Sequence, residues 1–124
     1  MTAIRIAVLV LAVIHALFVG LTSLVGAFAD GGGVWQRLLL VLLHPLGAAG
    51  VLLLLFLPRL SRTAILAIAA VLLANVIADL TLAQRIAAGA VRGDWELALA
   101  FAVVPVIGMA YALGILRSGR PTVG

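Results

Sequence analysis

The sequence predicts an all-α polytopic membrane protein, an up-down bundle of four transmembrane helices. Of its 124 residues, 66% are hydrophobic and 10% are charged, and the mean hydropathy is +1.38. A soluble domain carries about a quarter charged residues, so this chain lacks the polar surface to cover itself in water. The apolar residues gather in four runs, at positions 6–28, 35–57, 63–86 and 95–116. Each run reaches the roughly 20 helical residues that cross the hydrocarbon core.

The connections between these runs are short and contain glycine, proline or charged residues. Short connections force successive helices to lie antiparallel, so we expect one transmembrane domain spanning residues 1–124. Ser61 or Thr63 can cap the third helix. Loops of this length leave no room for a catalytic site outside the membrane, and no G-x-S-x-G, H-E-x-x-H or P-loop pattern is present. The sequence therefore predicts a protein that is not an enzyme.

The first apolar run also has a feature of a secretory signal peptide. Ala27-Phe28-Ala29, just before Asp30, has the small-x-small form of a cleavage site. The run at 6–28 is, however, longer than the roughly 7–15 residues of a signal core. We therefore expect a retained transmembrane helix.

The charged residues indicate how the chain is oriented. All eight basic residues are arginine, and the net charge is +4. The end of the expected bundle that holds both termini carries Arg5, Arg59, Arg62, Arg117 and Arg120. The opposite end carries Arg37, Arg85 and Arg92 together with Asp30, Asp94 and Glu96. The positive-inside rule then predicts cytoplasmic termini, and it accounts for the basic charge without nucleic acid as a partner.

The composition also bears on the source of the chain. Arginine without lysine, in a chain dominated by Ala, Gly, Val and Leu, is typical of a GC-rich bacterial genome. We therefore expect the bacterial cytoplasmic (inner) membrane as the location.

Rare residues recur at a spacing of 60 positions, which indicates two tandem hairpin repeats. The recurring pairs are Trp35 with Trp95 and Pro45 with Pro105, and the same offset aligns His15 with Asn75. Such a repeat relates the two hairpins by an axis along the membrane normal. The two tryptophans then begin the second and fourth helices at the outer interface, where indole rings prefer to lie.

Four polar residues interrupt the apolar helices at similar depths. They are His15, His44, Asn75 and Asp79. Counted at about 1.5 Å per residue from the outer helix ends, all four lie in the outer half of the membrane or near its midplane. Polar groups in a membrane face protein or water, so we expect one intramembrane polar cluster inside the bundle.

Small residues support this cluster, because they mark faces where membrane helices approach closely. On the third helix we expect a packed face formed by Ala67, Ala70, Ala74 and Ala78, and on the second helix Gly47 and Gly50 lie just below His44. The fourth helix contributes Gly108 and Ala112.

Asp79 and Asn75 have two interpretations. Asp79 can pair with Arg85 or a histidine inside the bundle, while Asn75 forms a hydrogen bond between helices. Alternatively, both residues serve a small transporter or channel that carries a proton, cation or small solute. One carboxylate does not make a pathway, so the sequence favours the structural interpretation.

His15 and His44 also have two interpretations. Two histidines on different helices at similar depth are what axial ligation of haem b requires, and with Asp79 they form a possible two-histidine, one-carboxylate metal set. The absence of cysteine excludes thiolate sites. Neither histidine has the local spacing of a strong motif, so the sequence favours two core histidines with satisfied hydrogen bonds and predicts no metal site.

These observations together predict a small integral membrane subunit. It lies in the lipid bilayer and packs against, or anchors, partners in a larger membrane-protein complex or a homo-oligomer. The alternatives are an electron-transfer subunit that binds haem or metal through His15 and His44, and a small transporter or channel that uses Asp79 and Asn75.

Overall fold

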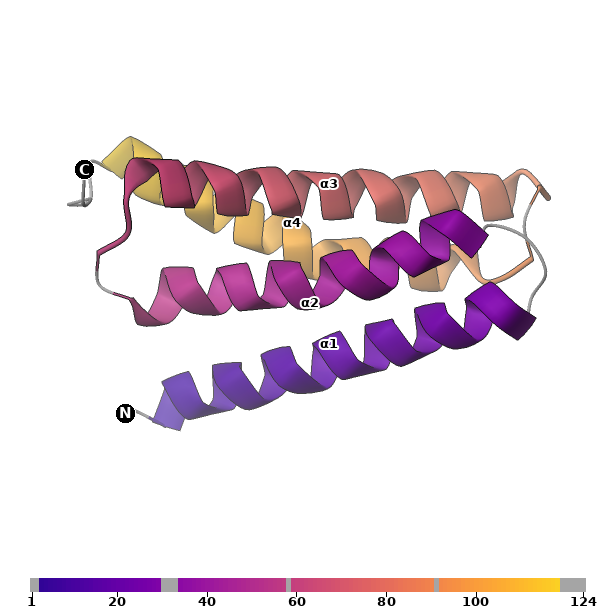
Figure 1. The fold of residues 1–124 in the computed structure, drawn as a ribbon, viewed down its shortest axis with the longest axis horizontal. Helices are drawn as coiled ribbons and strands as arrows, with labels where there is room; N and C mark the ends of the chain where they lie inside the picture. The colour runs from indigo at the N-terminus through magenta and orange to yellow at the C-terminus, as the bar shows by residue number, and fades with distance from the viewer. Residues whose placement is uncertain (1–2, 30–33, 58, 91, 119–124) are drawn as a thin grey trace.

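The computed structural model describes residues 3–29, 34–57, 59–90 and 92–118. Within them the chain forms four helices, α1 (Ala3–Ala29), α2 (Val34–Phe56), α3 (Arg62–Ala87) and α4 (Trp95–Ser118). Successive helices run in opposite directions, and the start of α1 lies at the same end as the finish of α4 (Figure 1). All four are long and apolar enough to cross a membrane. The predicted all-α four-helix membrane bundle is confirmed.

Local chemistry sets the helix ends within a few residues of the expected positions. α2 ends at Phe56, one residue early, because Leu57 precedes Pro58 and a residue before proline disfavours the helical conformation. Ser61, rather than Thr63, caps α3: its Oγ accepts a hydrogen bond from the Ala64 N–H at 3.0 Å. α1 extends three residues further toward the N-terminus than the apolar run does.

Hydrogen bonds cap the start of α4 and hold the loop before it against α2. Asp94 Oδ1 accepts hydrogen bonds from the backbone N–H groups of Glu96 and Leu97. Arg37 of α2 is buried and donates a hydrogen bond to the carbonyl of Arg92. A Cβ on Gly93 would lie 2.8 Å from the Arg37 guanidinium, and this residue has φ +146°, so the loop requires glycine there.

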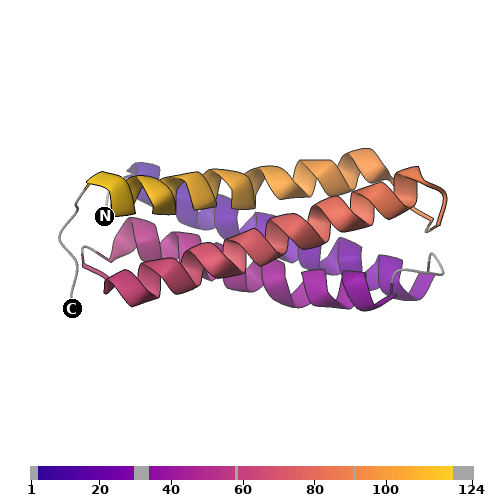
Figure 2. The same ribbon diagram turned by 90° about the horizontal axis from the view of Figure 1, so that it is seen from above.

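α2, α3 and α4 form the core, and α1 lies outside it against α2 (Figures 1 and 2). Among the side chains described on α1, Val19 is the one buried hydrophobic residue. α1 meets α4 through rings: those of Phe18 and Phe101 lie edge to face with centroids 5.9 Å apart. This peripheral position leaves most of α1 facing outward.

Two apolar clusters fill the core, one toward each end. We call the end that holds Trp35 and Trp95 the tryptophan end. The cluster nearer this end consists of Leu40, Leu43, Ala78, Leu82, Ala83 and Ala98. The cluster nearer the opposite end consists of Leu54, Ile65, Ala112 and Ile115. Between them, the core contains the polar residues described below.

The two prolines that the expected repeat pairs have different surroundings. Pro45 lies inside α2 and is exposed, whereas Pro105 lies inside α4 and is fully buried. The ribbon of α2 bends part-way along its length (Figure 1). A proline inside a helix removes one backbone hydrogen bond and bends it, which accounts for a bend in this helix. The tandem repeat itself stays a prediction.

The expected packed face of α3 is wrong for three of its four alanines. Ala78 is buried, but Ala67, Ala70 and Ala74 are exposed. The buried face of α3 is centred on Asn75 and its neighbours at helical spacing. At 3.6 residues per turn, the three alanines lie about a third to a half of a turn away from the centre of that face. They therefore form an outward stripe of small residues.

The glycines of α2 and α4 allow close helix contact, as expected. A Cβ on Gly50 would lie 2.8 Å from Ile68, and a Cβ on Gly108 would lie 2.7 Å from Val51 Cγ2. Ile68 and Val51 are β-branched and therefore stiff, so they yield little to an added methyl group. Gly114 lies on α4 like Gly108, but a Cβ added there would meet no atom within 4 Å.

Gly108→Ala should therefore destabilise the bundle, while Gly114→Ala should not. We expect a loss of about 1–3 kcal/mol for the first substitution, the usual cost of overpacking. Gly114→Ala gains helix propensity at no steric cost and should be neutral or slightly stabilising. Denaturation of both variants in detergent micelles, followed by circular dichroism, measures the difference. Equal stability of the two variants would contradict the close α2–α4 contact.

Candidate functional site: an intramembrane polar cluster

The centre of the candidate site is a hydrogen-bonded pair between α2 and α3. His44 Nε2 and Asp79 Oδ1 lie 3.0 Å apart. The exposed fractions of these side chains are 1% and 0%. His44 lies on α2 immediately before the exposed Pro45, and its buried side chain points into the core. Of the two partners predicted for Asp79, the structure therefore shows the histidine.

Arg85, the other partner considered for Asp79, lies elsewhere. It is exposed near the end of α3, six residues beyond Asp79, and an i,i+6 spacing does not bring two side chains together on a helix. Arg37 is the nearest charged residue along α2 and precedes His44 by seven residues, about 10 Å along the axis. Its hydrogen bond to the Arg92 carbonyl directs it toward the tryptophan end.

Asn75 lies one turn from Asp79 and forms a second bond between helices. Its Nδ2 donates to the carbonyl of Leu43 on α2 at 3.5 Å, and its side chain is fully buried. Asn75 is thus placed where the expected interhelical hydrogen bond can form. A Cβ on Gly47 would lie 3.0 Å from Asn75 Nδ2, so the glycine gives this amide its room.

His15 brings α1 to the same cluster. Its ring lies edge-on to the His44 ring, with centroids 5.9 Å apart and planes inclined by 70°. The ring of Phe101 on α4 contacts both histidines, at 6.5 Å from His15 and 6.1 Å from His44. All four predicted site residues therefore meet inside the bundle, and each of the four helices contributes to their surroundings.

Phe101 was missed by the sequence reasoning, although a signal for it existed. It lies four residues before Pro105, so both residues share one face of α4. Its buried ring contacts both histidines and closes the cluster on the side of α4.

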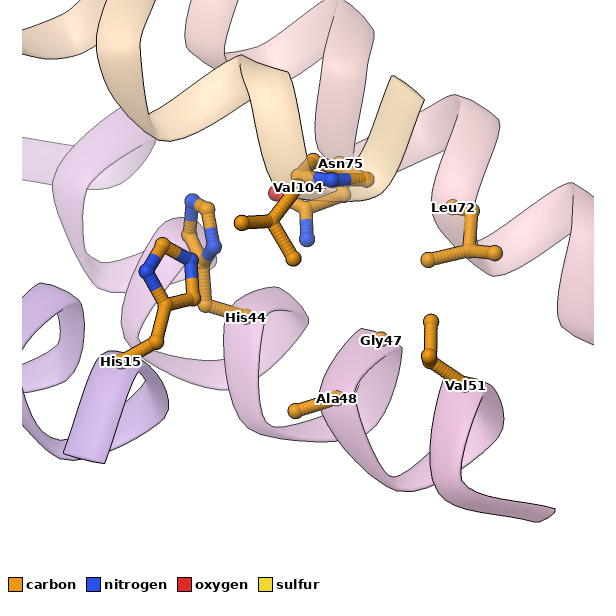
Figure 3. A pocket seen from close by; sticks show the side chains of 9 residues that line it. His15, His44, Gly47, Ala48, Val51, Leu72, Asn75 and Val104 are labelled. Carbon is orange, nitrogen blue, oxygen red and sulfur yellow. The ribbon is translucent and has the colours of Figure 1, made fainter. Parts of the chain in front are cut away.

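A small cavity adjoins the cluster (Figure 3). Its polar wall is formed by His15, His44 and Asn75, and its volume is about 10 Å³. This is close to the lower limit for one water molecule. The apolar wall consists of Gly47, Ala48, Val51, Leu72, Val104 and Pro105. The cavity is too small for a larger solute.

Three buried polar atoms of the cluster have no hydrogen-bond partner within the part of the chain that the structure describes. They are His15 Nε2, Asn75 Oδ1 and Asp79 Oδ2. Each buried polar group left unpaired costs free energy, about 1–3 kcal/mol in soluble proteins. Such groups require an explanation, and a small ligand or water is one.

The geometry does not fit haem b bound by His15 and His44. His44 Nε2 is engaged by Asp79, and the two imidazole rings meet edge to face. Cofactor pockets span about 300–1,000 Å³, whereas the cavity between these side chains is about 10 Å³. Nor do three His, Cys, Asp or Glu side chains among residues 3–29, 34–57, 59–90 and 92–118 converge on a possible metal position. We therefore derive no redox chemistry from this cluster.

No protein family model, curated protein or solved structure matches this chain. The fold and the site define a class by themselves: a small four-helix membrane protein with a hydrogen-bonded histidine–aspartate pair in its core. Its function has to be argued from the geometry of this cluster and of the outward surface.

A double-mutant cycle tests the energetic coupling of the pair. His44→Leu and Asp79→Leu each leave one polar partner buried alone, whereas the double variant removes both. We expect the double variant to be more stable than the sum of the single effects implies, with a coupling energy of at least about 1 kcal/mol. Unfolding in a mixed-detergent titration measures it. As a control, the losses of unfolding free energy caused by His44→Leu and Asp94→Ala, at two distant sites, should add. Additive losses for His44→Leu and Asp79→Leu as well would contradict the hydrogen bond between these residues.

Proposed function

We propose that this chain is a small integral membrane subunit that packs against a transmembrane helix of a larger membrane-protein complex. The observation that carries this proposal is the outward stripe of small residues on α3. The proposed location is the bacterial inner membrane, with both termini in the cytoplasm.

The stripe follows one side of α3 over most of its length. It consists of Thr63, Ala67, Ala70, Ala74 and Thr81, all of which are exposed. The spacings of three, four and seven residues keep these positions on one face of a helix. Thr81 Oγ1 donates to the carbonyl of Ile77 on its own helix at 2.7 Å, so the hydroxyl is satisfied without water. The face is therefore suited to an apolar neighbour.

A helix is the neighbour that benefits most from such a face. Association of membrane helices depends on close packing, which small residues allow because the backbones can approach. Larger exposed side chains, among them Leu66, Leu73 and Ile77, border the stripe along one side. A second helix can pack beside them, over the alanines, whereas lipid chains gain no comparable contact from a small-residue stripe.

The arginines support the proposed orientation. At the end where α1 begins and α4 finishes, Arg5, Arg59, Arg62 and Arg117 are all exposed. At the tryptophan end, Arg37 is instead buried and bound to the Arg92 carbonyl. The excess of surface arginine therefore lies at the first end, as the positive-inside rule requires of a cytoplasmic side.

Conduction of a solute by Asp79 and Asn75 through a single copy is less well supported. The cavity beside Asn75 has room for about one water molecule. Beyond it, the core is closed by the apolar cluster of Leu54, Ile65, Ala112 and Ile115. A polar pathway across the bundle needs further ionisable or polar side chains along its length.

Extraction of the native protein in mild detergent tests the proposal. We expect a partner membrane protein to copurify with the wild-type chain. Ala70→Leu should reduce its recovery at least 10-fold, because the larger side chain prevents close approach at the stripe. Ala100→Leu is the matched control, since Ala100 is exposed on α4, and it should retain the partner.

Two outcomes count against this function. Purification of the wild-type chain as a lone monomer contradicts a subunit role. Recovery as a homo-oligomer that Ala70→Leu dissociates assigns the stripe to a second copy and contradicts the larger complex.

A further inference from the structure

We propose that the His44–Asp79 pair binds one exchangeable proton within the membrane, and that a water molecule in the adjoining cavity connects the pair to His15. This inference does not depend on a partner protein. It rests on the three unpartnered polar atoms, the cavity and the charge balance of the cluster.

The charge balance requires a proton on the pair. A neutral imidazole beside a carboxylate carries a net charge of −1, which is costly in an apolar interior. The groups that face the pair offer no compensating charge: α1 contributes the imidazole of His15, α3 contributes the amide of Asn75, and α4 contributes the ring of Phe101. On α2, Arg37 lies two turns away and is bound to the loop before α4.

One additional proton makes the pair neutral, and two arrangements of it are compatible with the 3.0 Å contact. In the first, a protonated Asp79 donates to His44 Nε2. In the second, an imidazolium at His44 donates to the Asp79 carboxylate. Either arrangement gives a net charge of zero and keeps the bond between α2 and α3. The bound proton therefore stabilises the contact that holds the two helices together.

The cavity provides the connection to His15. His15 Nε2 and Asn75 Oδ1 belong to side chains that line it, and neither atom has a partner among the described residues. Both atoms can accept a hydrogen bond, and a water molecule can donate two. The volume of about 10 Å³ suits one water molecule, and such a molecule needs two to four polar partners. A bound water thus satisfies two of the three buried groups.

The transfer step conserves charge and atoms. From the imidazolium form of His44, the ring nitrogen that Asp79 does not use releases its proton to the water. The water in turn gives a proton to His15 Nε2 and is regenerated. His15 becomes an imidazolium, the pair returns to neutral imidazole and carboxylate, and the total charge of the cluster stays the same. His15 is half-buried on the peripheral helix α1, so it is the member of the cluster closest to the surface.

Nitrogen-15 NMR of the histidine rings tests the bound proton directly. The chain contains two histidines, so histidine-labelled protein in lipid nanodiscs gives two sets of ring signals. We expect His44 at neutral pH to show either two protonated nitrogens or an unprotonated Nε2 that accepts from the acid. A neutral His44 whose Nε2 carries the proton, beside a bare carboxylate, would overturn the proposal.

Two substitutions assign the signal. Asp79→Asn should shift the His44 Nε2 resonance, because the shared proton is lost with the carboxylate. Asp94→Asn is the matched control: Asp94 is exposed and caps α4, and asparagine can keep that cap, so the His44 signals should not move. The wild-type spectrum decides the proposal even where Asp79→Asn does not fold.

The rate at which the ring protons of His44 exchange with solvent deuterium tests the connection through His15. His15→Phe removes the acceptor while keeping a ring at this position, and we expect exchange to slow at least 10-fold. Phe18→Leu alters the neighbouring ring contact of α1 without removing a proton acceptor and should exchange at the wild-type rate. Wild-type exchange in His15→Phe would exclude the relay.

Discussion

The hydrogen bond between His44 and Asp79 is the interaction on which the rest of the core depends. Both side chains are buried where the surrounding helices are apolar, so neither can turn to water. Their bond fixes the rotation of α2 relative to α3, and with it the position of Asn75 against the carbonyl of Leu43. The same rotation brings His44 toward His15, which recruits the peripheral helix α1 to the cluster.

Much of this fold could be predicted from the sequence because the membrane limits the choices. Hydropathy and loop length determine the number and direction of the helices, and counting along each helix gives the depth of a polar residue. Depth alone brought His15, His44, Asn75 and Asp79 to one level. The requirement that polar groups avoid lipid then placed them inside the bundle.

The depth of a residue in the membrane does not say which side of its helix faces the core. The sequence therefore could not predict the features that depend on helix rotation. Ala67, Ala70 and Ala74 are small like the residues of a packed face, yet they lie on the outward side of α3 because the buried face is set by Asn75 and Asp79. The partner of Asp79 and the place of Phe101 depend on which helices are neighbours, and several arrangements of four helices satisfy the same loops. The cavity beside the cluster arises from these side-chain positions and has no signal of its own in the sequence.

The inward and outward features of α3 have different consequences. Its buried face holds the polar pair that orders the bundle, while its exposed alanines offer a surface to another helix. The contact between His44 and Asp79 underlies both, since it determines which way α3 is turned. The most direct test is the separation of His44 Nε2 and the Asp79 carboxyl carbon, measured by solid-state NMR dipolar recoupling in lipid bilayers. The 3.0 Å contact predicts a nitrogen–carbon separation of about 4 Å or less. A separation too long to be detected between these labelled sites would contradict the pair and the arrangement of helices built on it.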